Sequence, residues 1–147
     1  MTPGFQTNLL TGLAVYLQDA DLGVWSTSGA YTAKQTGIVL GSTPQAPDNC
    51  ITLNAYAVDD SPALSDSVIG VQIRCRWGGT DPRPVDDLAD AIFDLLHGLT
   101  AVRLSTGVFI VQCLRNSAAS LGQDGNNRWN NTSNYYFTVH RPSTNRT

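Results

Sequence analysis

Residues 68–97 read VIGVQIRCRWGGTDPRPVDDLADAIFDLLH, and within this stretch the hydrophobic period changes from two residues to a helical spacing. Its first part alternates apolar and polar side chains, which is typical of a strand with one buried face. The apolar set is Ile69, Val71, Ile73, Cys75 and Trp77, and the polar set is Gln72, Arg74 and Arg76. From about residue 82 a helical stripe follows, formed by Val85, Leu88, Ala89, Ile92, Leu95 and Leu96. The stretch therefore predicts a β-strand followed by an amphipathic helix.

Both ends of this helix, predicted over about residues 82–97, carry recognisable signals. Asp81 suits the N-cap, Pro82 suits the first helical position, and Gly98 can adopt the left-handed conformation that ends a helix. Three aspartates, Asp86, Asp90 and Asp94, recur every four residues on another side of it. They form either a solvated acidic face or part of a cation site, and we favour the acidic face because hard cations need six or more oxygens.

The flanking sequence predicts further elements on both sides. Residues 5–19 have apolar side chains at helical spacing, residues 50–58 alternate like a strand, and residues 38–40 suggest a short strand. Later strands are predicted near residues 101–104, 108–114 and 135–141. The first two are separated by Ser105-Thr106-Gly107 and form a predicted hairpin.

Residues 115–133 are polar and rich in Asn, Gly and Ser, so we predict a long functional loop there. The segment includes Leu121 and Trp129, and we expect the tryptophan to dock on this subunit or on a neighbour. Within it, Asp124-Gly125-Asn126 lacks the remaining ligands of a calcium loop and is predicted to be a tight turn.

Together these elements predict the fold class α+β. We expect a single mixed, mostly antiparallel β-sheet of four to six strands, with two helices packed on one face. Residues 1–147 form one predicted domain, in which residues 1–4 and 142–147 are expected to be flexible ends.

The composition favours a protein that packs against other proteins. Charged residues make up 14% of the sequence, against roughly 25% in typical soluble domains. The formal net charge of -3 argues against a general basic surface for nucleic acid. No signal peptide and no membrane span are recognisable, which favours a cytosolic location and no membrane partner. The sequence has three cysteines, an odd number, and we expect all three to be buried and free.

No catalytic signature is recognisable in the sequence. It has two histidines, and it lacks the common nucleophile, phosphate-binding, zinc and dinucleotide motifs. We therefore assign no catalytic, cofactor-binding or metal-binding residues and predict that the protein is not an enzyme. The row of Gln72, Arg74 and Arg76 is either a solvated strand face or a surface for a neighbouring subunit.

Several stretches together resemble the tail terminators of long-tailed bacteriophages, a family that includes minor capsid or head–tail joining proteins. They span nearly the whole sequence: Leu9–Leu17, Ile38–Gly41, Val71–Arg74, Val85–Leu99, Ser120–Asp124, Arg128–Trp129 and Asn134–Tyr136. The stretch at 85–99 and the pattern Ser-Leu-Gly-x-Asp…Arg-Trp…Asn-Tyr-Tyr are the most distinctive.

The resemblance implies a structural virion protein that is assembled in the bacterial cytoplasm. It would form a homo-oligomeric ring, typically a hexamer, that caps the tail tube, stops its polymerisation and joins the tail to the head neck. The expected partners are other copies of the protein, the tail tube protein and a connector or stopper protein, while DNA passes through the lumen without specific binding. The alternatives are another neck component (a stopper or connector subunit) and a small hydrolase or metal-dependent enzyme. We expect the subunit or partner contacts to include Arg74, Arg76, Leu121, Asp124, Arg128, Trp129, Tyr135 and Tyr136.

Overall fold

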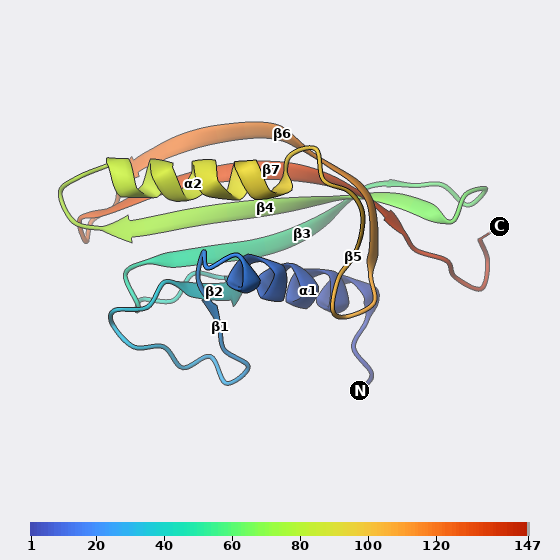
Figure 1. Cartoon of the computed structure of the whole chain (residues 1–147), viewed down its shortest axis with the longest axis horizontal. Coiled ribbons are helices and arrows are strands. Elements are labelled where there is room, and N and C mark those ends of the chain that lie inside the picture. Colours follow the sequence, from blue (N-terminus) through green and yellow to red (C-terminus); the bar gives the residue numbers. More distant parts are fainter. Residues whose placement is uncertain (147) are drawn as a thin grey trace.

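The computed structural model describes residues 1–146, which form two helices and seven strands (Figure 1). In sequence order these are α1 (Phe5–Asp19), β1 (Val24–Trp25), β2 (Gly37–Leu40), β3 (Cys50–Asp60), β4 (Asp66–Gly78), α2 (Arg83–Leu96), β5 (Thr100–Arg103), β6 (Phe109–Gln123) and β7 (Arg128–His140). The predicted fold class, α+β, is confirmed.

All seven strands belong to one curled sheet in the order β1-β2-β3-β4-β7-β6-β5. The sheet is mixed, because β1, β2 and β3 pair in parallel while the other pairs are antiparallel. The prediction of four to six strands is too low because β1 was missed. This strand has only two residues, too few for an alternating pattern, and its Val24 amide donates to the Thr36 carbonyl at 2.8 Å.

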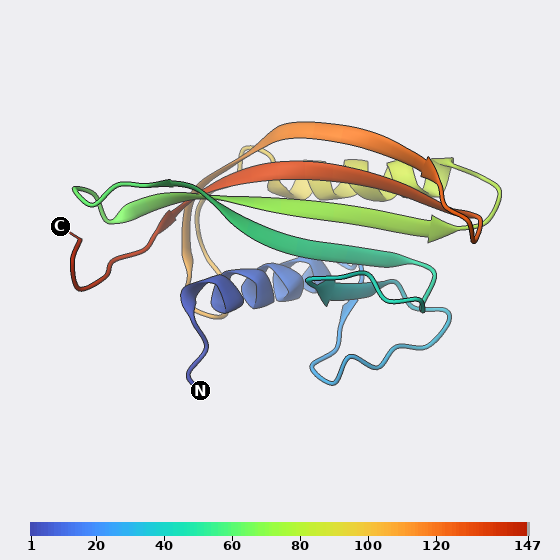
Figure 2. The ribbon, with the colours of Figure 1, turned by 180° about the vertical axis from the view of Figure 1, so that it is seen from behind.

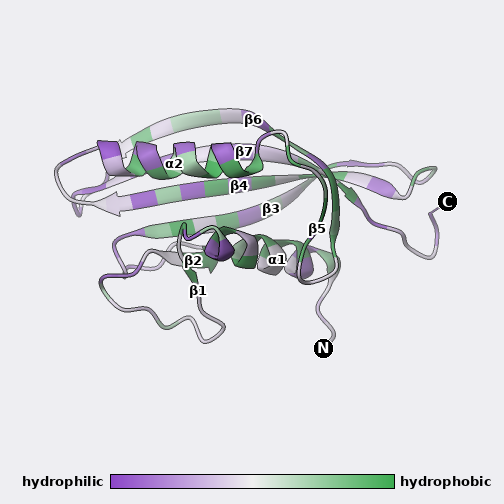
Figure 3. Cartoon of the chain, in the orientation of Figure 1, coloured by the Kyte–Doolittle hydropathy of each residue, from purple (hydrophilic) through white to green (hydrophobic). Residues whose placement is uncertain are grey.

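Both helices pack on the same face of the sheet, here called the inner face (Figures 1 and 2). The α1 helix contacts β1, β2 and β3, whereas α2 contacts β4, β7 and β6. A single core cluster joins residues of both helices to the inner residues of β3, β4 and β7. The apolar side of α2 faces this core and its polar side faces away from it (Figure 3). The opposite face, called the outer face, is covered by neither of the two helices in the described part of the sequence.

The predicted helix boundaries differ little from the observed ones. The α1 helix begins and ends as predicted, whereas α2 begins at Arg83, one residue later than expected. Asp81 still satisfies the first turn, because its Oδ1 accepts from the Arg83 amide at 3.0 Å. Gly98 has a φ of 84°, as predicted for the end of the helix.

The prediction of a long loop at 115–133 is wrong, because these residues form most of the β6–β7 hairpin. The segment is polar because the outer edge of β6 is exposed to solvent, and because the inner residues Asn131 and Ser133 are buried polar groups. The turn is tight, as predicted: the Asn127 amide donates to the Asp124 carbonyl at 3.1 Å. Trp129 docks within the subunit, opposite Trp77, and its Nε1 donates to the Gly79 carbonyl at 3.1 Å.

The C-terminal segment contacts the β3–β4 hairpin. The Arg146 guanidinium donates to the carbonyls of Ser61, Leu64 and Asp66 at 3.0, 2.8 and 2.6 Å. Residue 147 lies outside the described residues, so the flexible ends predicted at 1–4 and 142–147 stay a prediction.

The three cysteines are free and buried, as predicted. Burial raises the pKa of Cys75 and of Cys113 to about 12, and it also raises the pKa of Cys50. Their thiols are therefore uncharged at neutral pH and pack as small apolar side chains.

Gly12 provides a test of how closely α1 packs on the β5–β6 connection. A Cβ at this position would lie 2.8 Å from the Leu104 Cβ and 2.6 Å from the Thr106 Oγ1. Alanine has a higher helix propensity than glycine. We nevertheless expect Gly12→Ala to lower the free energy of unfolding by about 1–3 kcal/mol, because the added methyl group overpacks this contact. Urea unfolding measures this change. Gly125→Ala, where a Cβ meets nothing within 4 Å, is the control, and a more stable Gly12→Ala protein would contradict the packing.

Candidate functional site

A row of aromatic and apolar residues crosses the outer face on four adjacent strands. Tyr56 of β3, Gly70 of β4, Tyr136 of β7 and Leu114 of β6 are successive cross-strand neighbours. The Tyr56 ring lies over Gly70, in the space that a Cβ there would occupy. Tyr56 is 39% exposed and Leu114 is 43% exposed. Because the row is continuous, it has the form of a contact surface and not of scattered exposed side chains.

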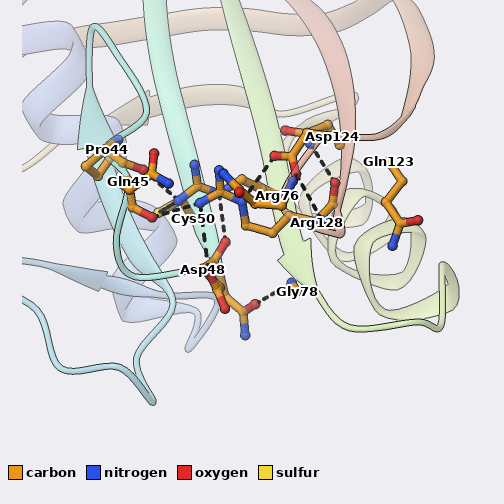
Figure 4. Close-up of polar contacts among 12 residues, drawn as sticks. Pro44, Gln45, Asp48, Cys50, Arg76, Gly78, Gln123, Asp124 and Arg128 are labelled. Atoms are coloured by element: carbon orange, nitrogen blue, oxygen red, sulfur yellow. Dashed lines mark hydrogen bonds and ion pairs between the residues drawn. The ribbon is translucent and has the colours of Figure 1, made fainter.

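Arg76 also comes from the outer side of β4, but its side chain is buried, with 5% of the residue exposed. It binds the segment before β3: its Nε donates to the Asp48 carbonyl at 2.8 Å, and its Nη2 donates to the carbonyls of Pro44 and Pro47 at 2.7 and 2.6 Å (Figure 4). Desolvation lowers the pKa of Arg76, and the nearby charge of Arg128 acts in the same direction. The arginine thus fixes a loop that has no secondary structure of its own.

Arg128 holds the same loop from β7 and is 6% exposed. Its Nη1 donates to the Gln45 carbonyl at 2.7 Å, and its Nε donates to the Asp124 carboxylate at 3.1 Å (Figure 4). Desolvation raises the pKa of Asp124, but hydrogen bonds from the amides of Asn126 and Arg128 and the Arg128 charge outweigh it, so the pKa lies below its usual value. Asp124 therefore ties the β6–β7 turn to the arginine that holds the loop at 44–48.

The structure separates the predicted interface residues into two groups. Partly or largely exposed are Arg74, Leu121, Asp124, Trp129 and Tyr136; buried are Arg76, Arg128 and Tyr135. The two arginines of the second group donate hydrogen bonds within the subunit. Partner contacts of all eight residues stay a prediction. Sequence reasoning missed the acceptors of the two buried arginines, because backbone carbonyls carry no signal in a sequence.

The outer edge of β6 is the longest unpaired strand edge among residues 1–146. The β5 strand pairs only with the beginning of β6, and the last contact along this edge is from the Arg115 amide to His97 Nδ1 at 3.0 Å. Beyond it, residues 116–123 read NSAASLGQ, without a charge or a proline. Monomeric proteins usually protect a free strand edge with charged residues or proline. Two β-bulges interrupt this part of β6, but they leave it in the sheet.

The acidic side of α2 is exposed, as expected for a solvated face. Asp86, Asp90 and Asp94 form no ion pair with any residue between 1 and 146. No group of three or more acidic, histidine or cysteine side chains in this range is placed to hold a metal ion. A contact of these aspartates with another molecule stays a prediction.

The structural role of Arg76 can be tested by removing its charge and keeping its bulk. We expect Arg76→Met to lower the free energy of unfolding by about 2–4 kcal/mol, because the carbonyls of Pro44, Pro47 and Asp48 lose their donor. Thermal or urea unfolding measures the loss. Arg83→Met is the matched control, because the Arg83 side chain is 83% exposed; equal midpoints for both variants would show that Arg76 does not hold the loop.

Comparisons with known proteins agree with this architecture. The model of a family described as bacteriophage tail terminator protein matches residues 16–141. A solved protein from the virion of a native gene transfer agent particle has the same fold, with a TM-score of 0.59 and 19% sequence identity over 92% of this sequence and 98% of the other. No curated protein matches the sequence. Because the family model covers most of the sequence, including both α2 and the β6–β7 hairpin, the protein belongs to the bacteriophage tail terminator family.

Proposed function

We propose that the protein is a structural component of a virion, where it forms a ring, a hexamer in the simplest case, that caps the finished tail tube. Family membership supports a structural phage protein and not an enzyme. The observation that carries the ring is the uncharged free edge of β6 at residues 116–123. An edge of this kind can accept a strand from another subunit, because its backbone donors and acceptors have no partner on that side.

The other end of the sheet offers a second open edge. The β2 strand pairs with β3 only as far as Leu53, so no strand of residues 1–146 lies beside the outer edge of β3 from Asn54 to Asp60. Because β3, β4, β7 and β6 pair antiparallel in turn, β3 and β6 run in opposite directions. Joining β6 of one copy to β3 of the next would therefore continue an antiparallel sheet. Such a head-to-tail contact closes into a ring when the rotation between copies closes.

The ring stops tube growth through the shape of its surfaces. One side binds the last layer of tail tube protein, so that no further tube subunit can add. The other side binds a connector or stopper protein of the head neck. DNA passes through the lumen without specific binding, which suits a protein of net charge -3 because clustered positive charge would hold the phosphates.

Assembly takes place in the bacterial cytoplasm, and the finished ring stays in the virion at the joint of tail and neck. None of the described helices is long and apolar enough to cross a membrane. The row of Tyr56, Tyr136 and Leu114 provides an apolar surface for one of the protein partners.

Tail length tests the capping role directly. In a phage that encodes this protein, deletion of its gene is expected to give over-long or headless tails, because tube subunits continue to add and the neck cannot bind. Negative-stain electron microscopy of lysates measures tail length and head attachment. A plasmid copy of the gene should restore normal particles, and normal-length tails joined to heads in the deletion strain would refute the proposal.

The proposed contact through β6 can be tested with lysines on its free edge. We expect Ala119→Lys combined with Leu121→Lys to convert the ring to monomers, because charged side chains at an edge oppose strand pairing. Light scattering of the purified protein gives the mass, and circular dichroism verifies the fold. Thr27→Lys, on an exposed loop far from β6, should leave the ring intact. A ring in the double variant would exclude this edge as the contact, and a monomeric unaltered protein at every concentration would contradict the ring.

A further inference from the structure

A polar pocket of about 420 Å³ lies on the outer face, between the loop at 41–45 and strands β3, β4 and β7. Three guanidinium groups line it, those of Arg74, Arg76 and Arg128, and we call it the arginine pocket. The hydroxyl of Thr52 and the amide side chain of Asn130 add polar groups to its wall. Arg74 and Arg76 form a polar row in the sequence, and the arginine pocket is where that row meets Arg128.

Each guanidinium in the arginine pocket keeps donors that the subunit does not use. Arg74 donates through Nε to Asn130 Oδ1 at 3.1 Å, and its two terminal nitrogens have no partner among residues 1–146. In the same range Nη1 of Arg76 and Nη2 of Arg128 are also without a partner. Neither nitrogen is among the fully enclosed atoms that lack a partner, so each keeps some exposure to solvent. The three arginines that carry these donors line one pocket, two of them from β4 and one from β7.

The charge of the arginine pocket is also not balanced within the subunit. Among the described residues, Arg74 and Arg76 have no carboxylate within 4 Å. Arg128 is the exception, with Asp124 at 3.1 Å and Asp48 at 3.8 Å. Three positive groups therefore face two negative ones in a recessed site, on a protein whose net charge is -3. Like charges held together away from water are stabilised by an anion that binds between them.

We propose that the arginine pocket binds a carboxylate group of another protein, either an aspartate or glutamate side chain or the carboxyl terminus. The planar fork of a guanidinium matches the two oxygens of a carboxylate, and Arg74 can supply both of its free nitrogens to one such group. That the carboxylate comes from a neighbouring protein of the particle rests on the proposed function. The preference of the pocket for a carboxylate does not depend on the proposed function.

The same geometry argues against a nucleic acid as the ligand. Phosphate backbones are bound by exposed arginines and lysines spread along a surface, whereas Arg76 and Arg128 are recessed and almost fully buried. Asp48 and Asp124 beside the arginine pocket would repel a polyanion that passes over its mouth, but they leave room for a single carboxylate between the arginines.

Acetate is the probe that tests the chemical preference on the isolated protein. At pH 7 and constant ionic strength, replacement of chloride by acetate is expected to shift the Nε–H resonance of Arg74 and the backbone amide of Thr52 along a saturable curve in the millimolar range. Arg74→Gln should weaken binding about tenfold or more, because a charge-assisted pair of hydrogen bonds is lost. Arg74→Lys keeps the charge without the fork and should bind acetate with an intermediate affinity.

Arg103→Gln is the matched control, because Arg103 lies on β5 outside the arginine pocket, and it should bind acetate like the unaltered protein. Thermal unfolding verifies that each variant is folded. Shifts that do not saturate would overturn the proposal. So would a Thr52 amide shift that is as large in Arg74→Gln as in the unaltered protein. Tighter binding of inorganic phosphate or of a short DNA duplex at the same resonances would also overturn it in favour of a phosphate ligand. Loss of acetate binding with an intact ring would reject the pocket alone, whereas a monomer that binds acetate would reject the ring alone.

Discussion

The burial of the inner face of the sheet, with β3 under α1 and with β4 and β7 under α2, is the constraint on which the rest of the structure depends. Val71, Ile73, Tyr135 and Phe137 are almost fully excluded from solvent, so the register between β4 and β7 is fixed by the hydrophobic effect. A shift by one residue would turn these side chains to the outer face. With that register set, Arg74, Arg76 and the tyrosine row must lie on the side that no helix covers.

On the outer face, buried charged side chains hold the loop at 44–48 in place through hydrogen bonds, not through apolar packing. Arg76 and Arg128 extend from adjacent strands to the carbonyls of the loop at 44–48, and Asp124 links the β6–β7 turn to the same cluster. Arginine suits this role because one guanidinium can satisfy several carbonyls at once. The same groups retain donors toward solvent, so a structural cluster can also serve as a recognition site.

Low charge and an open edge give the family function a physical basis. The free part of β6 lacks the charges that keep monomers apart, and the exposed row of Tyr56 and Leu114 adds an apolar surface beside it. The proposed capping role needs surfaces that are easily desolvated, since uncharged polar groups cost less to bury than charges. No arrangement of catalytic side chains is required for this task.

Local sequence alone determined both helices, the strands at 50–58 and 68–77, and the turn at Asp124, because periodicity and capping act within a few residues. It also determined that one sheet face is apolar. Only the tertiary structure decided that residues 115–133 form a β-hairpin, since a polar segment becomes β-structure when neighbouring strands satisfy its backbone. In the same way, Arg76 has an exposed-strand pattern in the sequence but is buried, because its acceptors are carbonyls of a loop about 30 residues away that only folding brings to it.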